Sequence, residues 1–245
     1  MVGGISPKEV VRMLLGGAFT EWEPLPLPWG SNRSFVIRFD IEGRDPLLAI
    51  YKPRSGERPL WDFPQGTLYK REYASYLFCE ALGWDFIPPT VIRKGPHGVG
   101  SLQLYIPPDP TMDYFALQEK RALDLQKMCL FDVIANNADR KAGHCFQGVD
   151  GKVWGIDHGL TFHPFPKLRT VIWNFVGEPI PEILLKDIRR LLKSFQETDG
   201  INHLLRPLLT NEEIQAFQIR LGNILETCSY PHPDPKSWNV PWSFY

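Results

Sequence analysis

Cysteine is scarce and scattered in this chain of 245 residues. Cys79, Cys129, Cys145 and Cys228 lie far apart, and no two of them are separated by only two residues. Structural zinc sites use closely spaced pairs of ligands, and disulfide scaffolds are much denser in cysteine. The pattern therefore disfavours both and predicts a reducing, cytoplasmic location.

An excess of one charge and long apolar runs are also lacking. Lysine and arginine number 27 against 28 acidic residues, which gives a formal net charge of −1. Proteins that bind nucleic-acid backbones carry a marked basic excess, so we expect no nucleic-acid partner. No apolar run approaches the roughly 18 residues that span a bilayer, and residues 1–17 do not have the pattern of a secretion signal. The sequence thus predicts no transmembrane segment.

The chain changes character near its middle. Strand-like alternation is found at residues 35–40, 47–52, 87–92 and 101–106. Helical spacing is found around residues 6–16, 67–82, 117–136, 181–197 and 211–228. Residues 107–112 resemble a hinge. We therefore predict an α+β protein of two lobes, in which residues 1–107 are mostly β and residues 108–245 mostly α, with a ligand cleft between them.

Two aspartates lie eighteen residues apart, each at the edge of a turn between apolar segments. Asp139 follows an apolar helix, and Asp157 follows a strand-like run and precedes a glycine. Phosphoryl transfer from ATP needs one carboxylate at the acceptor hydroxyl and another at the metal that bridges the phosphates. Asp139 would be the first and Asp157 the second, although aspartate in a turn can also serve turn geometry alone.

A lysine and a glutamate in the first half of the chain could position ATP. Lys52 ends a predicted strand, and Glu72 lies on the next helix. In two-lobed kinases a strand lysine holds the α- and β-phosphates while a helix glutamate fixes the lysine. A preceding turn carries Ser31, Asn32 and Ser34, which could present N–H groups and hydroxyls to phosphates. The same residues also fit an ordinary hairpin turn, and no Gly-x-Gly-x-x-Gly pattern is present.

With these residues in order, the chain resembles the phosphatidylinositol 3-/4-kinase-like branch of atypical kinases, which includes type II phosphatidylinositol 4-kinases and HipA-type kinases. It resembles in particular a small bacterial family of lipid-kinase-like proteins, over about residues 20–225. The motifs that carry the resemblance are Tyr51-Lys52-Pro53, Lys70-Arg71-Glu72-Tyr73-Ala74, Asn137-Ala138-Asp139-Arg140 and Ile156-Asp157-His158-Gly159.

The resemblance implies a protein-kinase-like fold with ATP between the lobes. By it, Lys52 and Glu72 match the residues that position ATP, Asp139 the catalytic-loop aspartate and Asp157 the metal aspartate. One position departs from the pattern, because His144 stands where these families place a Mg²⁺-binding asparagine. Imidazole suits Mg²⁺ poorly. A one-metal mechanism, a preference for Mn²⁺ and a loss of catalysis are the three open explanations.

The sequence therefore predicts an ATP- and Mg²⁺- or Mn²⁺-dependent kinase that phosphorylates a hydroxyl group. The acceptor is left open among a protein, a lipid headgroup and a small metabolite. Two alternatives share the fold. One is a nucleotide-binding pseudokinase that acts as a scaffold or sensor, and the other is an enzyme that transfers AMP.

Overall fold

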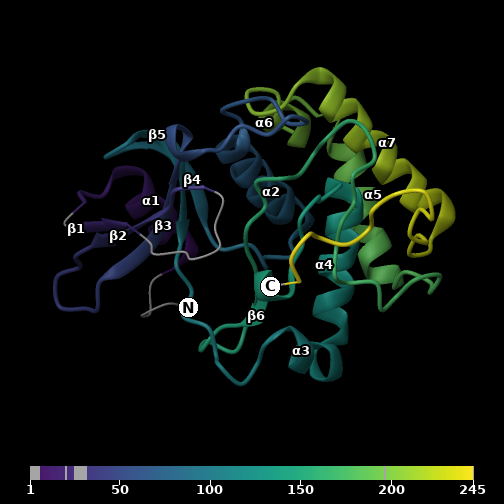
Figure 1. The fold of residues 1–245 in the computed structure, drawn as a ribbon, viewed down its shortest axis with the longest axis horizontal. Helices are drawn as coiled ribbons and strands as arrows, with labels where there is room; N and C mark the ends of the chain where they lie inside the picture. The colour runs from purple at the N-terminus through teal and green to yellow at the C-terminus, as the bar shows by residue number, and fades with distance from the viewer. Residues whose placement is uncertain (1–5, 20, 25–31, 196, 245) are drawn as a thin grey trace.

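The first part of the chain forms a five-stranded antiparallel sheet in the order β1-β2-β3-β5-β4 (Figure 1). The computed structural model describes residues 6–19, 21–24, 32–195 and 197–244. The strands are β1 (Glu21–Pro24), β2 (Phe35–Phe39), β3 (Leu47–Pro53), β4 (Thr90–Gly95) and β5 (Gly98–Leu104). Because side chains alternate across a strand, β2 and β3 bury every second residue in one core and leave Lys52 on the other face of β3.

The sheet carries a helix at its amino-terminal end. Helix α1 (Pro7–Gly16) begins with a capping box, in which Ser6 and Glu9 bond each other's backbone N–H groups. Val10 and Leu14 of α1 are buried in the same core as β2 and β3. The guanidinium of Arg93 in β4 donates to the carbonyls at the end of this helix and holds it on the sheet.

Helix α2 (Leu68–Leu82) lies between the sheet and the helical part of the chain (Figure 1). Gly83 is its C-cap, with a φ of 71° in the left-handed region that glycine adopts readily. Phe78 packs against rings of the helical core. Arg71 and Glu213, both buried, form an ion pair that ties α2 to α7. Helix α2 is therefore fixed on both of its sides.

The second part is mostly helical and includes one small hairpin. Its elements are α3 (Tyr114–Lys120), α4 (Ala122–Ala135), η3 (Ala142–His144), β6 (Cys145–Gln147), β7 (Val153–Gly155), α5 (Glu182–Ser194), α6 (Ile201–Leu205) and α7 (Asn211–Thr227). After α7 the chain returns across the helices toward β6 (Figure 1). None of the helices in the described part of the chain is long and apolar enough to cross a membrane.

Two details differ from the prediction. A single helix over residues 117–136 is wrong, because Arg121 leaves the helical region with φ −136° and ψ 44° and separates α3 from α4. Its guanidinium donates to Gln147 and Gly151 of the β6–β7 hairpin instead. The predicted strand at residue 87 begins only at Thr90, since two prolines before it have no N–H to donate. The α+β fold class is confirmed, and the boundary at residue 107 stays a prediction.

Candidate active site

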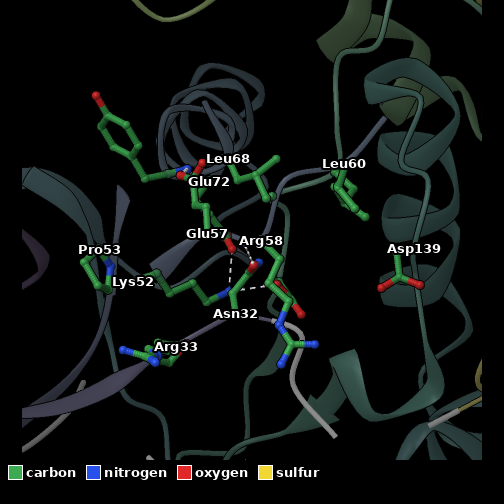
Figure 2. Close-up of a pocket in the computed structure, with 15 residues that line it drawn as sticks. Asn32, Arg33, Lys52, Pro53, Glu57, Arg58, Leu60, Leu68, Glu72 and Asp139 are labelled. Carbon is green, nitrogen blue, oxygen red and sulfur yellow. Dashed lines mark hydrogen bonds and ion pairs between the residues drawn. The ribbon is translucent and has the colours of Figure 1, made fainter. Parts of the chain in front are cut away.

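Six of the eight residues proposed from the sequence line one cavity between the sheet and the helical part (Figure 2). They are Asn32, Ser34, Lys52, Glu72, Asp139 and Asp157. His144 is not in the lining but contacts Asp157. Ser31 lies outside the described residues. The structure thus brings together side chains that are more than 120 residues apart in the sequence.

Lys52 is held by two carboxylates. Its Nζ lies 2.5 Å from Glu72 Oε1 and 2.8 Å from Asp157 Oδ1. The other oxygen of Glu72 accepts the N–H of His158 at 2.9 Å. Burial disfavours the charge of Lys52, but the carboxylates of Asp157 and Glu72 outweigh it and raise the lysine pKa above its ordinary value. The ammonium therefore stays charged and fixed in place.

Asp157 has an unusual backbone conformation. Its φ is +61°, in the left-handed region that a residue with a Cβ seldom occupies. The Lys52 ammonium holds the pKa of this carboxyl well below its usual range. The carboxylate exposes 49% of its side chain toward the cavity. A strained, ionised and accessible carboxylate is a common feature of functional sites.

Asp139 faces the same cavity from the opposite side (Figure 2). Helix α4 ends just before it, where Asn136 takes a left-handed conformation. The side chain of Asn137 accepts the Asp139 N–H at 3.1 Å and fixes the turn. Burial raises the pKa of Asp139 to about 6, and Lys141, 3.2 Å away, opposes that rise. A carboxyl with such a pKa can accept a proton near neutral pH.

A buried polar cluster supports the turn that carries Asp139. The Arg140 guanidinium is fully buried and donates to both oxygens of Asp132 in α4. It also bonds Ile156 O and lies 2.7 Å from His158 Nε2. Arg140 therefore joins the end of α4 to the segment that contains Asp157. The sequence did not lead us to predict this cluster. Asp132, an acidic residue inside an otherwise apolar helix, could have indicated a buried partner of opposite charge.

His144 is oriented by its own backbone neighbourhood. Its Nδ1 accepts the N–H of Lys141 at 3.3 Å, so the ring proton lies on Nε2, which faces Asp157 Oδ2 at 3.4 Å. Burial lowers the pKa of His144 to about 4, and the ring is neutral at pH 7. To bind a metal through Nε2, the ring would have to move its proton to Nδ1 and lose the bond to Lys141.

The donor set fits a metal that is shared with phosphates. Within the described residues no group of three or more His, Cys, Asp or Glu side chains could hold a metal ion. Mg²⁺ in phosphate sites is often bound by one or two carboxylates, with phosphate and water oxygens completing its shell. The ionised, accessible Asp157 satisfies that need, so the residues present fit a metal that arrives with a nucleotide.

The sequence did not point to several other residues of the cavity wall. Arg33, Glu57, Arg58 and Leu60 line it, and three of them belong to the loop between β3 and α2. A loop gives no periodic signal, and its path over the cavity depends on contacts with distant segments.

One curated relative covers nearly the whole chain. Protein Rv2133c of Mycobacterium tuberculosis (strain ATCC 25618 / H37Rv) is 36% identical over 247 aligned residues, which cover 86% of this chain and 87% of that protein. The chain belongs to the family of Protein Rv2133c. No protein-family model matches the chain. A second relative is phosphatidylinositol 4-kinase gamma 4 of Oryza sativa subsp. japonica, which is 31% identical over 187 residues. The alignment spans 62% of the chain but only 33% of the plant protein.

Solved structures show the fold of this Rv2133c relative. Hydra Fam20, solved with a sugar, superposes with a TM-score of 0.58 at 16% identity, over 90% of this chain and 88% of that one. The Golgi casein kinase with Mn/ADP bound superposes with a TM-score of 0.57 at 14% identity, over 93% and 80%. The predicted two-lobed kinase-like fold is therefore confirmed. Membership of the phosphatidylinositol 3-/4-kinase-like branch stays a prediction.

Proposed function

We propose that this protein is an ATP-dependent phosphotransferase that moves the γ-phosphoryl group of ATP to a hydroxyl. The observation that carries the proposal is the cavity in which Lys52, paired with Glu72 and Asp157, faces Asp139. A fixed ammonium, a carboxylate for a metal and a second carboxylate with a raised pKa are the groups that this reaction needs. Relatives named as kinases support the assignment.

Each residue then has one task. Lys52 binds the α- and β-phosphates, and Glu72 holds the ammonium in place. The turn before β2 contacts the phosphates through Asn32, Ser34 and the neighbouring Ser31. Asp157 holds Mg²⁺ or Mn²⁺, which neutralises phosphate charge when it is bound. The presence of Asn32, Ser34, Lys52, Glu72 and Asp157 in the wall of one cavity supports these roles.

Asp139 orients the acceptor. Its carboxylate accepts the proton of the acceptor hydroxyl as the oxygen attacks the γ-phosphorus, and ADP leaves with the bridging oxygen. The acceptor is a protein, a lipid headgroup or a small metabolite. The name of the plant relative supports membership of the phosphatidylinositol 3-/4-kinase-like branch. A lipid headgroup, one of these three acceptors, would fit that branch.

A second candidate function rests on His144. Since its Nε2 proton faces Asp157, His144 offers no lone pair to a metal at the position where the resemblance expects an amide oxygen. A pseudokinase that binds nucleotide without turnover would have such a site. Binding without consumption of ATP would identify it.

The test compares thermal unfolding of the native protein and of Asp157→Asn in the presence of ATP with Mg²⁺ or Mn²⁺. A ligand present at about 100 times its dissociation constant adds about 2.7 kcal/mol to the free energy of unfolding. We expect a metal-dependent rise of the midpoint in the native protein only. Asp199→Asn, an exposed residue far along the chain, is the matched control. The proposal fails if neither metal produces a rise in the native protein.

A further inference from the structure

Arg169 lies directly beside the turn that carries Asp139. Its N–H donates to Asn137 O at 2.9 Å, and its carbonyl accepts the N–H of Arg140 at 3.0 Å. These two bonds are made on either side of Asp139 along the chain, and Arg140 also pairs with Thr170 in a parallel bridge. Because all of these bonds use the main chain, a substitution of the Arg169 side chain leaves them in place.

The side chain of Arg169 lines a separate cavity of about 280 Å³. One wall of this cavity is the segment that ends at Arg169, and another is formed by residues 231–239. The two walls are joined by Asn239, whose carbonyl accepts the N–H of Thr170 at 3.1 Å and the indole N–H of Trp173 at 3.0 Å. Arg169 therefore belongs both to this cavity and to the support of the candidate site.

The guanidinium of Arg169 lacks a partner within the described part of the chain. Its Nε is buried and makes no hydrogen bond, and no described carboxylate pairs with the group. Lys167, another cation in the wall of the same cavity, is paired with Asp62 at 2.9 Å. The cation in contact with Asp139 is Lys141, at 3.2 Å. Burial of a polar atom without a partner costs free energy, which a bound anion would offset.

The charge of this guanidinium reaches Asp139. Burial raises the pKa of the Asp139 carboxyl, and the charge of Arg169 is among those that oppose the rise. Since such effects weaken with distance, the guanidinium and the carboxyl lie near each other. Figure 2 shows Asp139 on the side of the candidate site away from Lys52. A group bound at Arg169 would thus be close to a hydroxyl held at Asp139.

We propose that Arg169 binds an anionic group, a carboxylate or a phosphate, of the acceptor whose hydroxyl Asp139 orients. A guanidinium matches two oxygens of either group at once. The inference rests on the proposed function for the role of Asp139, and it narrows the acceptor to molecules that carry a hydroxyl and a negative group. Such a molecule is either free in solution or the headgroup of an anionic lipid, and the experiment separates the two.

The experiment is an NMR titration of small probes, without nucleotide, at pH 7.5. Glycerol 3-phosphate and glycerate carry hydroxyls beside a phosphate or a carboxylate, and glycerol is the neutral control. The variants are Arg169→Gln, Arg169→Lys and Asp139→Asn. Arg206→Gln, which removes an exposed arginine outside this cavity, is the matched control. Cooperative thermal unfolding of each variant shows that it folds.

We expect the native protein and Arg206→Gln to bind an anionic probe and not glycerol. Arg169→Gln should weaken this binding about tenfold or more, as the loss of a charge-assisted hydrogen bond would. Arg169→Lys should weaken it less, because it keeps the charge and loses only the paired geometry. Asp139→Asn should strengthen it about threefold, because an ionised carboxylate near the bound anion is removed.

A second arm tests the lipid source of the anion. Vesicles of phosphatidylcholine are sedimented with the protein, with and without phosphatidylglycerol, whose headgroup carries a phosphate and hydroxyls. Binding of the anionic vesicles that is lost in Arg169→Gln, without binding of the soluble probes, assigns the anion to a lipid headgroup. Binding of the soluble probes that depends on Arg169, without binding of the vesicles, assigns it to a free small molecule.

Two results overturn the inference. One is that no probe and no vesicle binds in a manner that depends on Arg169, which would leave the guanidinium only its effect on the Asp139 carboxyl. The other is binding that Arg169→Gln weakens and Asp139→Asn leaves unchanged, because the anion would then lie away from Asp139. If the native protein binds no nucleotide in the thermal test, the proposed function fails separately, and the dependence on Arg169 and Asp139 still decides the inference.

Discussion

Asp139 illustrates, at the scale of a residue, how a buried carboxylate in the candidate site lowers the free energy of unfolding. Burial raises the pKa of its carboxyl to about 6, so near pH 7 the folded protein holds an ionised group in a setting that disfavours the charge. In the unfolded chain the same group ionises near pH 4. Between these pH values the folded state binds more protons, and stability falls as the pH rises.

We predict that Asp139→Asn raises the free energy of unfolding at pH 7 by about 2 kcal/mol, because a neutral amide replaces a buried charge. The gain is fully present above pH 6, shrinks as the pH falls toward 4, and is gone below it. Urea denaturation at pH 7.5 and 4 measures it. A gain that is equal at both pH values would contradict the burial argument.

His144 gives a second prediction at this scale. Because its Nε2 carries the proton, we expect the native protein with bound ADP to hold one Mn²⁺ ion. An amide oxygen at this position can ligate a metal without moving a proton, so His144→Asn should bind a second ion. Electron paramagnetic resonance of free Mn²⁺ counts the bound ions. Two ions in the native protein, with one lost in His144→Ala, would show instead that the imidazole is a ligand.

At the scale of elements, a buried ion pair fixes the end of α4 to the site. Asp132 and Arg140 are both fully buried, and Arg140 reaches the segment before Asp157. Asp132→Asn leaves the guanidinium charge without its partner, and we expect a loss of about 3–5 kcal/mol in the free energy of unfolding. Denaturant unfolding measures the loss.

The matched control for this pair is the double variant Asp132→Leu with Arg140→Met, which removes both charges. It should recover a large part of the stability, because no buried charge is left unpaired. Asp124→Asn, in the first turn of the same helix and partly exposed, should cost about 1 kcal/mol or less. A double variant as unstable as Asp132→Asn would show that the loss comes from packing.

The elements show which parts of the molecule local sequence could predict. The alternation in β2 and β3 is a local signal, and it was confirmed. Capping boxes and the glycine that ends α2 are local signals of the same kind, which the structure also contains. The break at Arg121 was missed because its cause lies in the β6–β7 hairpin. The path of residues 57–63 was missed for the same reason, since Lys167 and His163 hold it from a hundred residues away.

The same distinction applies to the candidate site. The resemblance placed Lys52, Glu72, Asp139 and Asp157, and the structure brings them to one cavity. Local patterns could not identify cavity residues such as Arg58, whose place in the wall depends on how distant segments of the chain pack. The tautomer of His144 also depends on its contact with Lys141. The roles themselves stay predictions.

At the scale of the whole molecule, the last described residues return to the turn that follows Asp139. Phe244 O accepts the N–H of Ala142 at 2.9 Å, between Asp139 and His144, and its ring stacks on Phe115. Asn239 O accepts the N–H of Thr170 at 3.1 Å. Residues 239–244 therefore help to hold the turn that contains Ala142 and the segment that contains Thr170.

We predict that deletion of residues 243–245 speeds hydrogen exchange at residues 139–144, because the Ala142 N–H loses its acceptor. Hydrogen–deuterium exchange with mass spectrometry measures this. Trp242→Ala removes a side chain that is 80% exposed and keeps the Phe244 carbonyl, so it should leave the exchange unchanged. Native exchange in the deletion variant would show that the contact does not hold the turn.

The ion pair between Lys52 and Asp157 has a consequence for how a metal ion and a nucleotide would bind together. Without ligands the two side chains neutralise each other, and each is the proposed partner of an incoming group. A metal ion that takes Asp157 frees the lysine for phosphate, and phosphate that takes the lysine frees the aspartate for metal. If Lys52 and Asp157 have the proposed roles, the two ligands should bind with positive heterotropic cooperativity, and by linkage each would strengthen the other by the same factor. Such a protein would discriminate against uncomplexed nucleotide and respond to the metal–nucleotide complex as a single signal.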